Sequence, residues 1–470
     1  MLQKFLNWIR QVVSKMLGKT NVQEAIGADV SISSEMAEAI SLWERLYNGN
    51  PPWETETVQS TDLPSAVASE FARLIMTELE SEISGSARAD WLNEQYQQFR
   101  DTIQKDVELG CALGGMAFKP YPTADGNLAV DCTPADRFFP TGFDGSGRIT
   151  GGVFVDRFTK GSQYYTRFEC HELGENQQYT IRNLAYVSDN ASTLGYPTPL
   201  ESVPAWSNLT EELVLANVER PLFGYFRVPM ANHIDRDSPL GVSVYSRATH
   251  FFKQADEQWA RLMWEFEGTE LAVDISARAF RSDPETGKPI VPKNRCRLFR
   301  AHELGDVEKP LYEVFSPEIR DDPLYRGFNR ILQRIEFGCG LAYGTISDPL
   351  IVEKTAEEIK TSKQRSYSNV SALQHALQTA LEDLLYAMDA WATINRLAPQ
   401  GKYEASFSWG DSVVTDTDKE FMQRKALADG GYLKPEKFIA WYFGISEEEA
   451  LEYLPGENKD DDLFPPTAKE

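Results

Sequence analysis

The sequence predicts an α+β protein in which a helical frame carries a β-rich region. Two observations indicate this class. Residues 34 to about 110, and residues 238 onward, repeat apolar side chains at helical spacing. Residues 115–230 instead contain short β-prone runs separated by turn clusters such as Asp125-Gly126 and Lys160-Gly161. Strands inserted into a helical chain in this way are typical of the α+β class.

Composition limits the functions open to this chain of 470 residues. Hydrophobic residues make up 42% and aromatic residues 11%, which excludes a disordered chain. The formal net charge is −24, from 47 basic and 71 acidic side chains. Tight DNA binding depends on Lys and Arg side chains that displace counterions from phosphates. A chain this acidic is therefore a poor candidate for binding DNA tightly. It could still surround a duplex without holding it.

Cysteine usage and hydropathy point to a protein of the reducing cytoplasm. The cysteines are Cys111, Cys132, Cys170, Cys296 and Cys339. Their odd number and wide spacing, with no CxxC pair, argue against a disulfide framework and against a zinc site. No stretch of 18 apolar residues occurs, so we expect no membrane span.

The first seventeen residues have the pattern of an amphipathic helix and not of a signal peptide. Basic residues are interleaved with apolar ones, whereas a signal peptide keeps its charges ahead of an unbroken apolar run. The basic residues are Lys4, Arg10 and Lys15, and the apolar ones include Leu2, Phe5, Leu6, Ile9, Val13 and Met16. We expect this helix to pack on its own protein, with docking to a partner or a membrane surface as the alternatives.

Helices and then strands follow in order. Three helices are expected before residue 110: Met36–Tyr47 capped by Ser33 or Ser34, a second from Pro64 through Leu79, and a third from about Ala87 to Leu109. The expected strands are Ala117–Tyr121, Leu128–Cys132, Val153–Phe158, Tyr164–Leu173 and Tyr179–Val187.

A long amphipathic helix is predicted over residues 238–268. Ser238 can serve as its N-cap and Pro239 as its first helical residue, and apolar residues from Val244 to Phe266 recur every three or four positions. Residues 271–315 then have the pattern of a β-like insertion with loops.

This insertion carries a basic patch that stands out in an acidic chain. Between residues 278 and 300, seven basic residues face only Asp283 and Glu285, a local balance of +5. The basic residues are Arg278, Arg281, Lys288, Lys293, Arg295, Arg297 and Arg300. The patch is either a solvated loop face or a surface for an acidic partner or for DNA passing nearby.

A return helix is predicted from Asp322-Pro323 to the glycines at 338, 340 and 344. Its Arg326, Arg330 and Arg334 are four residues apart and therefore share one face. They could pair with Glu265 and Glu267 of the preceding long helix, in the same subunit or in the next, or they could form a solvated stripe. Residues 341–354 are expected to form a loop.

The longest predicted helix runs from residue 355 to about 397. Thr355 and Glu358 form a capping box, and an apolar stripe extends from Val370 to Ile394. A change of face near residues 366–369 predicts a kink. One half-buried strand at 403–409 follows, then three short helices marked by Gly430-Gly431, by Pro435 and by Ser446 with Glu449, and finally an acidic tail.

Motifs for nucleotide or metal chemistry are incomplete. Gly18-Lys19-Thr20 matches the end of a P-loop, but Val13 stands where the first glycine is required. The five histidines are dispersed without HExxH spacing, and no GxSxG motif is present. We therefore expect no catalytic residues, no cofactor, no metal and no enzyme activity, although a pair of glycosidase-type carboxylates among so many acids stays open.

Several stretches, in this order and spacing, resemble the portal proteins of tailed double-stranded DNA phages, in the branch typified by long-tailed phages of Gram-positive hosts. The resemblance covers roughly residues 110–430. The stretches are Asp136-Arg-Phe-Phe-Pro140, Tyr165-Thr-Arg-Phe-Glu-Cys-His171, Tyr179-Thr-Ile-Arg-Asn183, Ser238-Pro-Leu-Gly-Val-Ser243, Glu265-Phe-Glu267, Gly344-Thr-Ile-Ser-Asp348, Lys354-Thr-Ala-Glu-Glu-Ile359 and Trp409-Gly-Asp-Ser-Val413.

The resemblance implies a division of the chain into the parts of a portal subunit. These are a wing (1–237, β-rich over 115–230), a stem helix (238–270), a clip (271–315), a stem return helix (316–340), a tunnel loop (341–354), a long kinked helix (355–398), a wing strand (399–415), and a crown with its acidic tail (416–470). The tunnel-loop residues Gly344, Thr345, Ser347, Asp348, Leu350 and Ile351 would face DNA, and the basic patch would lie on the clip and dock partners.

The resemblance also implies a function. Portal subunits form rings, usually of twelve copies, at one vertex of the capsid in the virion. The terminase large subunit pumps DNA through the ring, which contacts double-stranded DNA without sequence preference, and a head-completion adaptor later docks on the clip. Major capsid and scaffolding proteins are the other expected partners, no membrane is involved, and assembly takes place in the host cytoplasm. A different virion or scaffold interaction protein and an unrecognised hydrolase are the alternatives.

Overall fold

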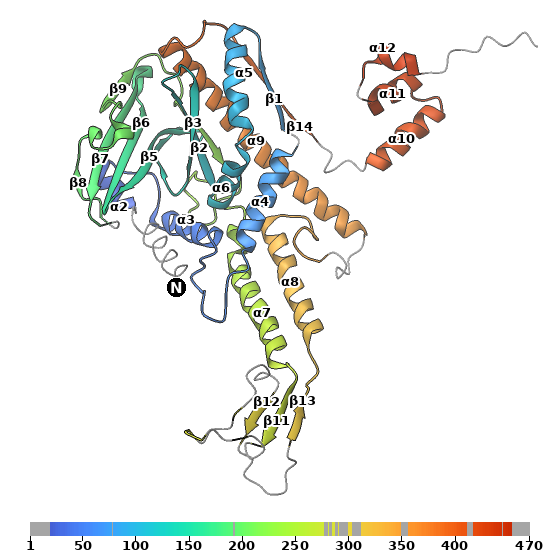
Figure 1. The fold of residues 1–470 in the computed structure, drawn as a ribbon. Coiled ribbons are helices and arrows are strands. Elements are labelled where there is room, and N and C mark those ends of the chain that lie inside the picture. The colour runs from blue at the N-terminus through green and yellow to red at the C-terminus, as the bar shows by residue number, and fades with distance from the viewer. Residues whose placement is uncertain are drawn as a thin grey trace, which may run out of the picture. The chain divides into compact units, whose positions relative to one another are not determined.

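The computed structural model describes residues 19–77, 79–190, 193–276, 281, 284–286, 290, 299–302, 312–348, 356–410, 417–443 and 445–453. The chain divides into two compact units, Met1–Ser408 and Trp409–Glu470. Both helices and sheets are present, which confirms the α+β class (Figure 1). The amphipathic helix predicted over residues 1–17 lies outside the described residues.

The first unit begins with a helical layer. Its helices are α2 (Lys19–Ile26), α3 (Ser34–Tyr47), α4 (Leu63–Met76), α5 (Ala87–Arg100) and α6 (Gln104–Leu113). Ser33 caps α3 as predicted, because its hydroxyl accepts a hydrogen bond from the Met36 amide at 3.3 Å.

Two helix boundaries in this layer differ from the prediction. Leu79 does not end a helix but begins strand β1 (Leu79–Ser84). That strand alternates buried and exposed residues, and it pairs with β14 (Glu404–Trp409), more than 300 positions along the chain. The single helix expected from Ala87 to Leu109 is two helices with a turn between them. In both cases the fold overrides a helical pattern that local propensity favoured.

The predicted strands between residues 115 and 230 are confirmed and form two sheets. A three-stranded antiparallel sheet has the order β10-β2-β3, and a six-stranded sheet has the order β4-β5-β6-β7-β8, with β9 also on β7. The strands are β2 (Gly115–Pro122), β3 (Leu128–Pro134), β4 (Phe138–Phe143), β5 (Ile149–Lys160), β6 (Gln163–Leu173), β7 (Tyr179–Ser188), β8 (Tyr196–Pro197), β9 (Glu212–Leu215) and β10 (Gly224–Arg227). Short 3-10 turns lie at Glu175–Gln177, Leu200–Ser202, Pro204–Trp206 and Ser246–Ala248.

The long helix α9 (Ala356–Ile394) supplies one side of the core. Its predicted apolar stripe is buried from Val370 through Met388 against β2, β10 and the β7 region, where Ala387 joins a cluster with Tyr179 and Leu222. The helix is continuous across residues 366–369, and a bend there stays a prediction. The capping box at Thr355 lies outside the described residues.

The predicted helix start at Ser238 is wrong. Residues 240–245 run without helix, and α7 begins only at Thr249 and ends at Gly268. Packing explains the difference. Val242, Val244 and Tyr245 are fully buried, and the Val244 amide donates a hydrogen bond to the Cys111 carbonyl at 3.0 Å. The chain passes so closely that a Cβ on Gly241 would lie 2.2 Å from the Gly114 carbonyl oxygen.

Helices α7 and α8 (Asp321–Cys339) lie side by side, and a small sheet occupies the chain between them (Figure 1). That sheet has the order β12-β11-β13, from β11 (Ala272–Ser276), β12 (Phe299–His302) and β13 (Tyr312–Phe315), so the expected β-like insertion is confirmed. Of the glycines predicted to break this helix, Gly340 is confirmed. Helix α8 continues through Gly338 and ends at Cys339, and Gly340, with a φ of +81°, is its left-handed C-cap.

The second unit contains the three short helices that the sequence predicts. They are α10 (Thr417–Asp429), α11 (Pro435–Phe443) and α12 (Glu447–Ala450), followed by a 3-10 turn at Leu451–Tyr453. Ser446 and Glu449 form the expected capping box. The acidic tail after residue 453 lies outside the described residues.

Candidate functional site: a helix pair, the loop that follows it and a polar pocket

The helix pair α7 and α8 is held by aromatic, amide and ionic contacts along its length. The rings of Trp259 and Phe328 lie 5.4 Å apart, and the Gln258 amide donates a hydrogen bond to the Leu324 carbonyl at 3.1 Å. Farther along, Glu265 accepts hydrogen bonds from the backbone and guanidinium of Arg320 at 2.8–3.1 Å. These contacts hold the two helices together along their length, and the small sheet lies in the chain between them.

Of the alternatives for Glu265, pairing with the three arginines within the same subunit is wrong. Glu265 pairs with Arg320, which directly precedes α8, and not with Arg326, Arg330 or Arg334. The reason is geometric, since Glu265 lies near the end of α7 and meets the start of the returning helix first. The three predicted arginines are exposed, and Arg330 donates a hydrogen bond to Gln333 on its own helix.

Glu267 and the three arginines therefore face solvent in this single chain. Within the described part of the chain, no ion pair joins Glu267 to Arg326, Arg330 or Arg334. The alternative that they pair with a neighbouring subunit stays a prediction.

The helix pair also exposes large apolar side chains. Trp264 is 65% exposed and Phe266 46%, and Met263 and Tyr325 are more than a third exposed. Large exposed apolar side chains that lie close together in the chain are typical of a region that binds another protein. The sequence pattern had placed Met263 and Phe266 on the buried face of this helix.

The predicted clip residues are only partly described. Arg281 is exposed, and Arg300 lies on β12. Arg278, Lys288, Lys293, Arg295 and Arg297 lie outside the described residues. Apolar residues are exposed on the edge strand β13, where Tyr312 is 62% and Val314 55% exposed. An exposed edge with such side chains can accept another chain.

The start of the predicted tunnel loop is bound to α8 by a buried carboxylate. Glu336 is fully buried, and its carboxylate accepts hydrogen bonds from the amides of Ile346 and Ser347 at 2.8 and 2.9 Å and from the Ser347 hydroxyl at 2.8 Å. Asn329 holds the next residue, because its side chain accepts from the Asp348 amide at 2.8 Å and donates to the Asp348 carbonyl at 3.4 Å.

Helix α9 binds the same segment from its other side. The Asn369 amide donates a hydrogen bond to the Gly340 carbonyl at 3.2 Å, and Arg365 donates to the Leu341 carbonyl at 3.4 Å. The Arg365 guanidinium also lies 4.5 Å from the centre of the Phe337 ring. Residues 340–348 therefore form a turn that is fastened to both helices.

This turn corrects part of the tunnel-loop prediction. Ser347 is buried and bonded to Glu336, so it does not face a channel in this chain. Gly344 and Thr345 are half-buried in the same turn, and Asp348 is held by Asn329. Leu350 and Ile351 lie outside the described residues.

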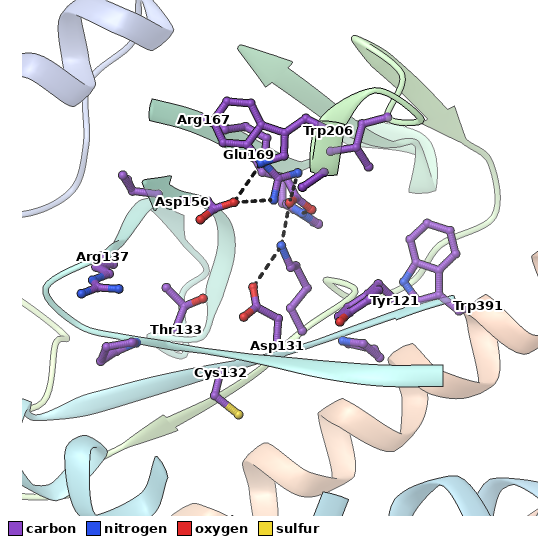
Figure 2. A pocket seen from close by; sticks show the side chains of 17 residues that line it. Tyr121, Asp131, Cys132, Thr133, Arg137, Asp156, Arg167, Glu169, Trp206 and Trp391 are labelled. Carbon is purple, nitrogen blue, oxygen red and sulfur yellow. Dashed lines mark hydrogen bonds and ion pairs between the residues drawn. The ribbon is translucent and has the colours of Figure 1, made fainter. Parts of the chain in front are cut away.

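A polar pocket of about 400 Å³ is lined by both large sheets and by α9 (Figure 2). Lys119 on β2 is one of its lining residues. Its ammonium is 2.6 Å from a Glu169 carboxylate oxygen on β6 and 3.6 Å from Asp131 on β3. Arg167 bridges Glu169 at 3.1 Å and Asp156 on β5 at 3.8 Å. The dashed lines in Figure 2 follow these pairs across the pocket.

The electrostatics of this pocket centre on Glu169. Burial acts to raise the pKa of Glu169, but the neighbouring Lys119, His171 and Arg167 hold that pKa well below its usual range. Burial lowers the pKa of His171, whose ring nitrogens contact Glu169 and the Tyr179 hydroxyl at 2.8 Å. The imidazole is therefore neutral at pH 7.

The pocket is best explained as an ionic connection between the two sheets. Burial raises the pKa of the Cys132 thiol at its wall, so that this sulfur stays protonated. Lys119 and Arg167 both have acidic partners. Sequence reasoning predicted the strands but missed this cluster. The available signal was the alternation of Arg167, Glu169 and His171, which places three polar side chains on one face of β6.

Two other properties concern the described residues as a whole. None of the helices in the described ranges is both long enough and apolar enough to cross a membrane. No group of three or more His, Cys, Asp or Glu side chains in those ranges is arranged to hold a metal ion.

Comparison with solved structures gives a distant likeness. No family model matches the sequence, and no curated protein matches it. Among solved structures, a chain from the neck of a native GTA particle, computed with C12 symmetry, is 10% identical. The match covers 91% of this chain and 99% of that chain, with a TM-score of 0.42.

Proposed function

We propose that this chain is a portal protein of a tailed double-stranded DNA phage. Copies would form a ring, of twelve subunits in the virion, at one vertex of the capsid. The phage genome would be packaged through the ring by the terminase and later ejected through it. The chain would act as a channel and a docking platform and not as an enzyme.

The large apolar side chains exposed on the helix pair are the observation that carries this proposal. Trp264 and Phe266 on α7 and Tyr325 on α8 are exposed in the single chain. Covering such side chains stabilises an assembly by roughly 25 cal/mol for each Å² of apolar surface removed from water. Trp264 and Phe266 are two positions apart and point to opposite sides of α7, and a ring in which each helix pair packs between two neighbours would cover both.

Charged residues on the same helices favour contact between copies. Arg326, Arg330 and Arg334 form an exposed row on α8, and Glu267 is exposed on α7. In a ring, the arginine row of one subunit would meet acidic residues of its neighbour. Such pairs would contribute little to affinity but would set the register between subunits.

The small sheet and its basic residues fit the role of a clip. The sheet lies between the two helices in the chain, Arg300 belongs to its strand β12, and the exposed Arg281 lies in the chain between β11 and β12. Its exposed apolar edge at Tyr312 and Val314 supplies contact area, and its positive charge would attract an acidic partner. The terminase large subunit and a head-completion adaptor would dock there, while capsid and scaffolding proteins would contact other surfaces.

The net charge suits a channel through which DNA slides. Twelve chains of −24 each give a formal charge of −288. Acidic walls repel phosphates and so avoid holding the duplex at favoured positions. The predicted tunnel loop, residues 341–354, would make loose contacts with DNA without sequence preference, through residues other than the buried Ser347.

Light scattering and negative-stain imaging of the purified chain test this proposal. A ring of about a dozen subunits with a central hole is expected. A protein that stays monomeric at high concentration would overturn the proposal, as would a closed assembly without a hole. A ring whose inner wall binds duplex DNA tightly at physiological salt would contradict the sliding channel.

A further inference from the structure

A groove of about 480 Å³ runs along helix α3. Ile32, Ile40 and Phe139 are buried and form its apolar floor, and Ala37 and Leu42 are half-buried at its sides. Lys19, the first described residue, also lines it. The chain that precedes Lys19 therefore starts at the groove itself.

Acidic side chains also line this groove, beside Lys19 and Arg45. Glu38, Glu44 and Asp136 line it. One carboxylate oxygen of Asp136 is buried without a hydrogen-bond partner, and the other is 3.6 Å from the guanidinium of Arg137, which is 64% exposed. Burial, and then repulsion from Asp136, raise the pKa of Glu44 to about 7. A cation placed beside these two carboxylates would remove that cost.

The segment before Lys19 has the matching chemistry. Residues 1–18 contain Lys4, Arg10 and Lys15 and no acidic residue, and their apolar residues recur at helical spacing. As a helix, eighteen residues would span roughly 27 Å, and the fourteen residues of α3 span roughly 21 Å. The segment is thus long enough to lie along the whole of α3.

We propose that residues 1–18 lie in this groove as an amphipathic helix, with their apolar face on Ile40 and Phe139 and their basic residues beside Glu44 and Asp136. The occupant belongs to the same chain because Lys19 lines the groove, so no linker has to reach a neighbouring copy. This inference does not depend on ring formation.

Thiol labelling of the full-length chain tests the proposal. Ser41 lines the groove and is half-buried, and Ser41→Cys would report whether the groove is covered. Labelling by a maleimide is compared between this variant and the same variant carrying Lys4→Glu, Arg10→Glu and Lys15→Glu. We expect labelling about tenfold slower with the native segment, the factor that an occupancy of nine-tenths produces.

Matched controls separate docking from general effects. Ser34→Cys, exposed on the same helix and outside the groove, is expected to react equally fast in both backgrounds. The unsubstituted chain gives the background from native thiols. Combining Glu44→Gln with Asp136→Asn removes charge with little change of shape and should speed labelling at position 41, whereas the exposed Glu54→Gln should not.

Three results would overturn the inference. The first is equal labelling of Ser41→Cys in both backgrounds. The second is slow labelling of the charge-reversed Ser41→Cys chain once it is mixed with chains that carry the native segment. That result would show that the groove binds the segment of a second copy. The third is an unprotected groove in a full-length chain that binds vesicles rich in anionic lipid, which would assign the segment to a membrane surface.

Discussion

The carboxylate of Glu265 accepts three hydrogen bonds from Arg320, one from its amide and two from its guanidinium. Glu265 lies near the end of α7, and Arg320 directly precedes α8. The contact therefore joins the two helices where the chain leaves for the small sheet and returns from it. Hydrogen bonds from Arg320 lower the pKa of Glu265, so the pair stays charged at neutral pH.

Removing this contact should open the end of the helix pair. Glu265→Gln removes the charge that holds the Arg320 guanidinium, and we expect faster amide hydrogen exchange at residues 266–269 and 320–323. Arg326→Gln, on the exposed row of α8, serves as the control and should leave exchange in both segments unchanged. Equal protection in Glu265→Gln and the unsubstituted protein would contradict this role.

Glu336→Gln should loosen the turn that begins the α8–α9 loop. Both backbone amides donate to one carboxylate oxygen, and the neutral amide oxygen of Gln is a weaker acceptor, so these bonds weaken at a cost of about 1–3 kcal/mol. We expect faster exchange of the Ile346 and Ser347 amides. Ser347→Ala removes only the hydroxyl contact and should have a smaller effect. If exchange does not change in Glu336→Gln, the carboxylate does not hold the turn.

The exposed aromatic residues of α7 should be needed for assembly. Replacing Trp264 and Phe266 with Ser removes apolar surface that the single chain leaves exposed, and we expect loss of rings in light scattering while the chain stays folded. Tyr196→Ser is the matched control, because Tyr196 is 80% exposed but lies far from α7 in the sequence. Rings of normal size from the Trp264 and Phe266 variant would exclude this face from the contact between subunits.

Glu169 should make stability depend on pH. Its pKa in the folded protein lies well below the ordinary value of 4.5, so the unfolded chain binds the proton more readily. The stabilisation is therefore complete above the unfolded pKa and is lost as the pH falls toward the folded one. Glu169→Gln leaves Lys119 and Arg167 without their shared partner and should cost about 3–5 kcal/mol at pH 7.

Chemical denaturation at several pH values measures this effect. The difference between Glu169→Gln and the unsubstituted protein should shrink as the solution is acidified below pH 4.5. Glu172→Gln, at an exposed position of the same strand, should follow the unsubstituted protein at every pH. A constant difference across the pH range would show that the Glu169 charge is not what stabilises the pocket.

Reversing the basic patch should separate docking from assembly. Changing Arg281, Lys288, Lys293 and Arg295 to Glu should leave ring formation intact and block capture of the terminase large subunit or of the adaptor in a pull-down. Reversing Lys253 and Arg261 on α7 provides a variant with altered charge elsewhere. Normal capture by the patch variant would place partner docking on another surface.

The elements that the sequence determined are those whose signals are local. Ser33 caps α3, and Ser446 and Glu449 form a capping box, both as predicted. The predicted stripe on α9 is buried from Val370 to Met388, but its last residue, Ile394, is exposed. A cap depends on residues three positions apart, and a stripe depends only on helical period. Both are therefore visible in the sequence of one chain.

The tertiary structure alone decided the contacts between distant segments. Ser238 has the chemistry of an N-cap, yet the packing of Val242 and Val244 against α6 delays the helix to Thr249. Glu265 had several arginines within plausible reach, and only the meeting of two helix ends selects Arg320. Lys119 and Glu169 are fifty residues apart and come together through the pairing of sheets. Such contacts depend on how whole helices and sheets pack against one another. The free energy of that packing is a sum over many residues far apart in the chain, so no local sequence pattern reveals it.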